Sequence, residues 1–175
     1  MENKIKTKFT VASEEGIAVL QMLGEKRGQE KYGRILSVAQ LEDYLFDKFN
    51  TATIVNHLNT FSNQLIVVYV EDQPAGYAYL SGNGRVPQEF QDKRVIHLQD
   101  FEVLNAYQGT SAKEILLEKC LNVCKSYEVL RLTVNTEAKE MISFYERYGF
   151  QQKASEEISM AGIKLQLAVL IKVNP

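Results

Sequence analysis

A tight turn followed by a helix is the part of this 175-residue chain whose composition points most directly to ligand binding. The turn at residues 107–111 reads YQGTS, and either Thr110 or Ser111 can cap the helix that begins at Ala112. The first N–H groups of a helix have no intrahelical acceptor, and the helix dipole places partial positive charge beside them. The turn is therefore expected to bind an anion such as a phosphate, with an ordinary capped helix as the alternative.

The elements around this turn alternate between strand and helix. Val95 to Val103 is mostly apolar and rich in β-branched and aromatic residues, which predicts a strand. Helical spacing of apolar residues follows from Ala112 to Lys125, Leu130 to Val134 alternates as a strand does, and helical spacing returns from Asn135 to Tyr148. Gly149 stands where a left-handed residue ends a helix. This order predicts parallel strands joined by a right-handed crossover.

The second half of this region resembles a known family. Its residues Asn135-x-x-Ala138, Phe144-Tyr145 and Tyr148-Gly149-Phe150 are similar to the N-x-x-A, FY and GF signature of the GCN5-related N-acetyltransferase (GNAT) superfamily. The turn resembles the family less closely. Gly109 and the pair Leu116-Leu117 are kept, but Ser111 and Lys113 stand where small residues usually let a pyrophosphate approach.

The resemblance implies a fold and an activity. The fold would be α/β, with a mixed central sheet of about six to seven strands flanked by helices and a splayed parallel strand pair, in a single domain of residues 1–175. The activity would be transfer of an acetyl group from acetyl-CoA, the co-substrate, to a primary amine by direct attack. The acceptor would be a small amine or polyamine, or a peptide N-terminus, and a looser similarity is to bacterial polyamine-type acetyltransferases. The alternative is a catalytically weak or inactive acyl-CoA-binding module that acts through protein interaction.

The resemblance also implies which residues hold the cofactor. Backbone groups of Phe101 and Val103 would pair with the pantetheine arm as an added strand does, where the parallel pair splays apart after Leu132. Asn135 would bond the same arm, and a helix N-cap is its alternative role. The phosphates would bind the turn, whose residues are Gln108, Gly109, Thr110, Ser111, Ala112 and Lys113.

Two residues are implied in catalysis. Tyr145 would donate a proton to the departing CoA thiolate, because a phenol of unperturbed pKa ~10 is protonated at neutral pH, and a core aromatic is its alternative role. His97 occupies the position of a carboxylate that many relatives carry, and its unperturbed pKa of ~6.5 suits a general base. A structural histidine is the alternative. Asp100 and Glu102 are expected on the opposite face of that strand by alternation.

The rest of the chain predicts further elements on both sides of this region. Ser13 is expected to start a helix that ends near Gly24 or Arg27, with a loop from Gly28 to Ile35, and Ser37 to Gln40 is a capping-box pattern that opens a second helix. A short third helix is expected around Ile54 and Leu58. Strands are expected at Lys4–Ala12, Gln64–Val70, Gly76–Leu80, Gln151–Glu157 and Ile163–Val173, with a hairpin turn at residues 71–74, a loop at residues 81–93 and a break at Gly162.

Composition narrows the class of protein. A net charge of −2 and a pI near 5.8 give no electrostatic case for binding nucleic acid or an anionic membrane. The polar N-terminus lacks a signal-peptide core, and no apolar run approaches the ~20 residues that a membrane span needs. Cys120 and Cys124 lie one helical turn apart on an apolar face, so reduced core cysteines are expected, with no metal site and a cytoplasmic location. The sequence does not determine the oligomeric state, and a homodimer is one alternative.

Overall fold

The computed structural model describes residues 4–175, which divide into two compact units. The first unit is made of residues 4–80 and 100–122, and the second of residues 81–99 and 123–175. Residues 1–3, the start of the polar N-terminal stretch, lie outside the described residues. Among the residues described, no helix combines the length and the apolarity needed to cross a membrane. One acetyltransferase domain over residues 1–175 stays a prediction.

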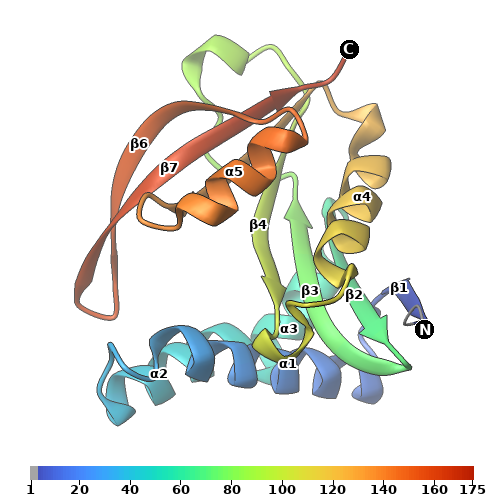
Figure 1. The fold of residues 1–175 in the computed structure, drawn as a ribbon, viewed down its shortest axis with the longest axis vertical. Coiled ribbons are helices and arrows are strands. Elements are labelled where there is room, and N and C mark those ends of the chain that lie inside the picture. Colours follow the sequence, from blue (N-terminus) through green and yellow to red (C-terminus); the bar gives the residue numbers. More distant parts are fainter. Residues whose placement is uncertain (1–3) are drawn as a thin grey trace. The chain divides into compact units, whose positions relative to one another are not determined.

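The first unit contains four α-helices, the last of them without its final residue, and the first strands of the sheet (Figure 1). Its strands follow the order β1-β2-β3-β4, and β1 runs antiparallel to β2 with Ile5 opposite Val70. A hydrophobic core joins the helices to the strands and includes Leu20, Ile54 and Tyr77. The elements are β1 (Ile5–Phe9), α1 (Glu14–Tyr32), α2 (Val38–Phe49), α3 (Thr51–Asn59), β2 (Asn63–Val70), the second half of β4 (Val95–Val103) and, each except for its last residue, β3 (Gln73–Ser81) and α4 (Ala112–Val123).

The second unit continues from the first half of β4 in the strand order β4-β5-β7-β6. β5 pairs in parallel with β4 and antiparallel with β7, and β6 and β7 form a long hairpin (Figure 1). The seven strands of residues 4–175 confirm the expected mixed sheet and its parallel pair. The elements are β5 (Val129–Asn135), α5 (Lys139–Arg147), β6 (Gln151–Met160) and β7 (Ile163–Val173).

The parallel ladder is shorter than either of its strands. It pairs Val95 with Val129 and ends at the pair Leu98 and Leu132, although β5 continues to Asn135. Beyond Leu132, β5 keeps its antiparallel partner, because Asn135 still lies opposite Leu167 of β7. Separation of the parallel strands after Leu132 was expected, and the ladder ends at that residue.

The first helix is longer than the sequence predicted. α1 runs to Tyr32, so the expected end near Gly24 or Arg27 and the loop from Gly28 to Ile35 are wrong. A Cβ on Gly24 would lie 2.4 Å from the Phe49 ring, and one on Gly28 would lie 2.5 Å from Leu45. Both glycines are therefore places where α2 packs closely on α1, and neither ends the helix.

The last helix is shorter than predicted. α5 begins at Lys139, not at Asn135, because Asn135 is the last residue of β5. Its end is as expected: Gly149 has φ of +89°, in the region that favours glycine. The chain then enters β6, whose hairpin with β7 turns through Ala161 and Gly162, both at positive φ.

Candidate active site

The predicted phosphate turn is a capped helix start in the first unit. The Thr110 hydroxyl oxygen accepts a hydrogen bond from the Ala112 N–H at 3.2 Å, so Thr110 satisfies the first N–H group of α4. The same hydroxyl donates to the Tyr107 carbonyl oxygen at 2.7 Å, which closes the turn. Ser111 is exposed, and a Cβ on Gly109 would meet no atom within 4 Å. This open space beside Gly109 fits a bound phosphate.

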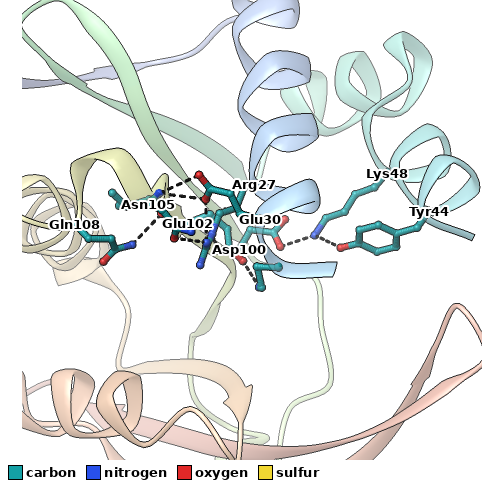
Figure 2. Close-up of polar contacts among 10 residues, drawn as sticks. Arg27, Glu30, Tyr44, Lys48, Asp100, Glu102, Asn105 and Gln108 are labelled. Carbon is teal, nitrogen blue, oxygen red and sulfur yellow. Dashed lines mark hydrogen bonds and ion pairs between the residues drawn. The ribbon is translucent and has the colours of Figure 1, made fainter. Parts of the chain in front are cut away.

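The Gln108 side chain is exposed and turns back toward the end of β4. Its Nε2 donates a hydrogen bond to the Val103 carbonyl oxygen at 3.0 Å (Figure 2). The Val103 side chain is buried and Phe101 is half-buried. The Val103 carbonyl predicted to pair with pantetheine thus already has an intramolecular partner, which a cofactor would share or displace.

Charged side chains of α1 form hydrogen bonds and ion pairs with the residues that lead into this turn (Figure 2). Arg27 Nε donates to a Glu102 carboxylate oxygen at 2.8 Å, and Lys31 pairs with the other oxygen. The Glu30 carboxylate accepts from the Asn105 N–H at 3.1 Å. Glu102 and Asn105 are therefore tied to one helix before the turn begins.

Sequence reasoning missed this network because it placed the second half of α1 in a loop. Arg27, Glu30 and Lys31 follow the i, i+3, i+4 spacing of one helical face, and this spacing is the signal that could have found them. Burial opposes the charged form of Arg27, but Glu102 outweighs it and raises the pKa of the guanidinium. The pairs are half-buried, so solvent screens them only in part.

A pocket of the first unit contains a carboxylate among aromatic rings. It lies where α1, α2 and α3 meet β2, β3 and β4, and four of its lining residues, Leu20, Ile54, Leu65 and Tyr77, are buried. Two of its lining side chains form an ion pair, Lys48 Nζ to Asp100 Oδ1 at 2.6 Å, and Lys48 Nζ also donates to the Tyr44 hydroxyl at 3.4 Å (Figure 2). The lining residues are Leu20, Lys48, Phe49, Ile54, His57, Leu65, Tyr77, Tyr79 and Asp100.

The electrostatics of this pocket are nearly balanced. Burial disfavours the charged form of Lys48, but Asp100 outweighs it, so the pKa of the ammonium is raised. Burial is the main cause that lowers the pKa of His57, with Lys48 acting in the same direction and Asp100 against it. His57 is therefore uncharged at neutral pH, and one cation and one anion remain.

The His57 ring is positioned by stacking. It lies on the Tyr79 ring with centroids 4.8 Å apart and an angle of 23° between planes, and the Tyr79 hydroxyl accepts from Asn63 Nδ2 at 2.9 Å. Asn50 caps α3 by accepting from the Thr53 N–H at 2.9 Å, which fixes the helix that carries His57. The sequence predicted a short helix around Ile54 and Leu58, but it did not single out His57 on that helix as a candidate site residue.

The second unit contains Asn135 and Tyr145. Asn135 Oδ1 accepts from the Glu137 N–H at 2.9 Å, which closes a turn two residues before α5 begins. Tyr145 is 4% exposed, and its ring meets the edges of Phe144 and Phe150 at centroid distances of 5.4 and 5.7 Å. The packing of Tyr145 is that of a core aromatic, and its role as proton donor stays a prediction.

His97, also in the second unit, is 2% exposed. Neither ring nitrogen has a hydrogen-bond partner within residues 4–175, and a Cβ on Gly84 would lie 2.7 Å from the ring. Burial first, and then the charge of Arg131, lower the pKa of His97 to about 4. The ring is thus neutral at physiological pH, and its role as general base stays a prediction.

The predicted site residues divide between the two units. Phe101, Val103 and the turn at residues 108–113 lie together in the first, and His97, Asn135 and Tyr145 lie in the second. Both cysteines are buried, and burial raises the pKa of the Cys124 thiol to about 12, which makes it a poor nucleophile. The described part of the chain has no group of three His, Cys, Asp or Glu side chains placed to hold a metal ion.

Comparison with protein families gives one match. Residues 28–167 match the model described as an acetyltransferase (GNAT) domain. A search of curated protein sequences found no match.

Solved structures share the fold across the chain. The PaiA N-acetyltransferase from Thermoplasma acidophilum, in complex with coenzyme A, matches with a TM-score of 0.74 at 15% identity over 97% of this chain and 99% of its own. A probable acetyltransferase from Staphylococcus epidermidis gives 0.75 at 13% identity over 98% and 100%. Arabidopsis thaliana NAA60 with a bisubstrate analogue gives 0.71 at 9% identity over 98% of both chains.

Proposed function

Since the chain belongs to the GNAT family and is an acetyl-CoA-dependent N-acetyltransferase, we propose that its acceptor is a primary amine. The amine is on a small molecule, such as a polyamine, or at a peptide N-terminus. It attacks the thioester directly, without a covalent enzyme intermediate. The observation that carries the proposal is the pocket lined by Asp100, which directly precedes Phe101 in β4, the first strand residue expected to meet the cofactor.

The turn before α4 supports binding of the cofactor phosphates. Its helix start supplies N–H groups, and the open space beside Gly109 leaves room for an oxygen to approach the backbone. Ser111 is exposed and adds a hydroxyl. The proposed contacts of the cofactor arm are the backbone of Phe101 and Val103 and the Asn135 side chain.

The acceptor nitrogen loses two protons and the thiolate gains one, so one proton is released overall. The ammonium gives its first proton to a base, and the freed lone pair forms the new N–C bond. The C–S bond then breaks with its electron pair left on sulfur, and the nitrogen loses its second proton, which balances the one that the sulfur receives. Tyr145 is the proposed donor to that sulfur. His97 is the proposed base, and its low pKa means that it is unprotonated at neutral pH.

The first experiment measures binding and turnover separately. Acetyl-CoA and CoA are titrated into the protein by calorimetry, and release of free thiol is followed with a panel of amines that includes spermidine. We expect binding of both cofactor forms and thiol release with at least one amine. Absence of binding at high concentration would mean that Ser111 and Lys113 close the phosphate site, and the enzyme proposal would then fail.

A further inference from the structure

The turn before α4 is tied to a helix that lies far from it in the sequence. We propose that Glu30 of α1 is a positioning residue for cofactor binding, because it fixes the backbone that leads into the turn at residues 108–113. The inference rests on the proposed function in taking this turn as the site of the cofactor phosphates. All of the contacts involved lie within the first unit.

Glu30 caps a short helical turn to which it does not belong. The segment Asn105–Tyr107 forms a single 3₁₀ turn, and Leu104, the residue before it, has no side-chain hydrogen bond to its N–H groups. The Asn105 N–H is the first of these groups and donates to both carboxylate oxygens of Glu30, at 3.1 Å each. The first N–H groups of a helical turn have no acceptor within it. Glu30 therefore supplies from α1 the cap that the local sequence lacks.

Hydrogen bonds continue from this cap to the start of α4. The Asn105 carbonyl oxygen accepts from the Gln108 N–H at 3.2 Å. The Tyr107 carbonyl oxygen accepts from both the N–H and the hydroxyl of Thr110, at 3.0 and 2.7 Å. The Thr110 hydroxyl oxygen in turn accepts from the Ala112 N–H, the first of α4. A shift of Asn105 would thus pass through consecutive hydrogen bonds to the N–H groups proposed to bind phosphate.

Glu30 is itself held by Arg27, which lies one turn earlier on α1. Arg27 Nη1 donates to Glu30 Oε2 and to the Asn105 side-chain oxygen, at 3.0 Å in both cases (Figure 2). Arg27 Nε is fixed in turn by the Glu102 carboxylate at 2.8 Å. Glu30 thus binds the main chain of Asn105 while Arg27 binds its side chain.

Side-chain packing anchors only the ends of this segment. Leu104 is buried in the core of the first unit, Tyr107 packs against that core, and Ala112 is buried at the start of α4. Gly109 and Ser111 between them are exposed. Hydrogen bonds therefore decide the path of the backbone through the turn.

Positioning and electrostatics predict opposite results for the loss of Glu30. The residue carries a negative charge, so charge alone would make the anionic CoA bind more tightly after Glu30→Ala. Positioning predicts weaker binding, because the Asn105 N–H loses its acceptor. The sign of the change in affinity separates the two effects.

The first arm of the test measures the Kd of CoA by calorimetry. Glu30→Ala should raise the Kd by about 3- to 30-fold, the range expected for loss of an N-cap. Glu30→Gln keeps a side-chain oxygen that can accept from Asn105 and should recover most of the lost affinity. The matched control is Glu25→Ala, which removes the same charge from an exposed position on another face of α1 and should leave the Kd unchanged. Unchanged or tighter binding by Glu30→Ala would overturn the inference.

The second arm follows amide hydrogen exchange of the CoA-free protein by mass spectrometry. Residues 105–112 should exchange faster in Glu30→Ala than in the wild type or in Glu25→Ala, because local opening becomes easier without the cap. Equal exchange in these proteins would also overturn the inference. This arm uses no ligand, so it does not depend on whether the turn binds CoA.

The two arms separate the inference from the proposed function. No binding of CoA to the wild-type protein, together with faster exchange in Glu30→Ala, would refute the proposed phosphate site and reduce Glu30 to a cap of the turn. Binding of CoA with equal affinity to the wild type and to Glu30→Ala would refute the inference and leave the proposed function standing.

Discussion

Lys48 of α2 and Asp100 of β4 form an ion pair of 2.6 Å at a pocket that three helices and three strands enclose. The two residues are 52 positions apart in the chain. Their side chains are 32% and 16% exposed, so the pair is only partly screened by solvent. The ammonium also lies 5.7 Å from the centroid of the Phe49 ring, a further favourable contact for a cation.

Replacing Lys48 by Met should lower the free energy of unfolding by about 2 kcal/mol, because it leaves the half-buried Asp100 carboxylate without its charged partner. Urea unfolding followed by circular dichroism measures this change. The control is Lys93→Met, which removes the more exposed Lys93–Glu128 pair and should cost much less. Equal losses in the two variants would mean that the pocket pair is no stronger than a surface pair.

Replacing Tyr145 by Phe should reduce kcat by about 10²- to 10⁴-fold if its hydroxyl is the proton donor, with little change in KM for acetyl-CoA. The buried ring and its contacts with Phe144 and Phe150 are kept, so the variant should remain folded. Thiol release under saturating substrate measures kcat. Tyr148→Phe is the control on the same helix end, and an unchanged kcat in both variants would leave Tyr145 with a packing role only.

His97 should make the protein less stable in acid. Its folded pKa of about 4 lies below the unfolded value of ~6.5, so the unfolded chain binds the proton more readily. The contribution is fully present above pH ~6.5 and is lost as the pH falls toward 4, with an upper limit of about 3 kcal/mol.

The measurement uses the fact that the chain has two histidines. A His57→Gln protein is compared with the double variant His57→Gln/His97→Leu by urea unfolding between pH 7 and 4. The double variant should lose less stability over this range. Parallel pH profiles in the two proteins would contradict the low pKa of His97.

Two glycines should respond differently to Ala. Gly149 has φ of +89°, so Gly149→Ala should cost about 1–2 kcal/mol of stability. A Cβ on Gly109 meets nothing within 4 Å, so Gly109→Ala should leave stability unchanged. If the turn binds phosphate, Gly109→Ala should nevertheless weaken CoA binding by about tenfold or more, because a methyl group would fill the space of an oxygen. Unchanged affinity in calorimetry would exclude that contact.

The local sequence determined the elements that surround the turn. The strand Val95–Val103 was predicted with its observed bounds, and the capping box at Ser37 is present with both of its hydrogen bonds. Gly149 ends α5 as its position indicated. These features depend on periodicity, capping and backbone freedom, which involve residues close to each other in the chain.

The tertiary structure decided the features that depend on distant partners. From the sequence, Gly24 and Gly28 indicate the end of a helix, but in the structure they lie inside α1 where α2 packs against it. Asn135 is the last residue of a strand because it pairs with β7. Lys48 pairs with Asp100, and His97 is buried against Gly84, because the fold brings these separate segments of the chain into contact. Side-chain charge and pKa depend on burial and on neighbours in space, and only the folded chain brings those neighbours together.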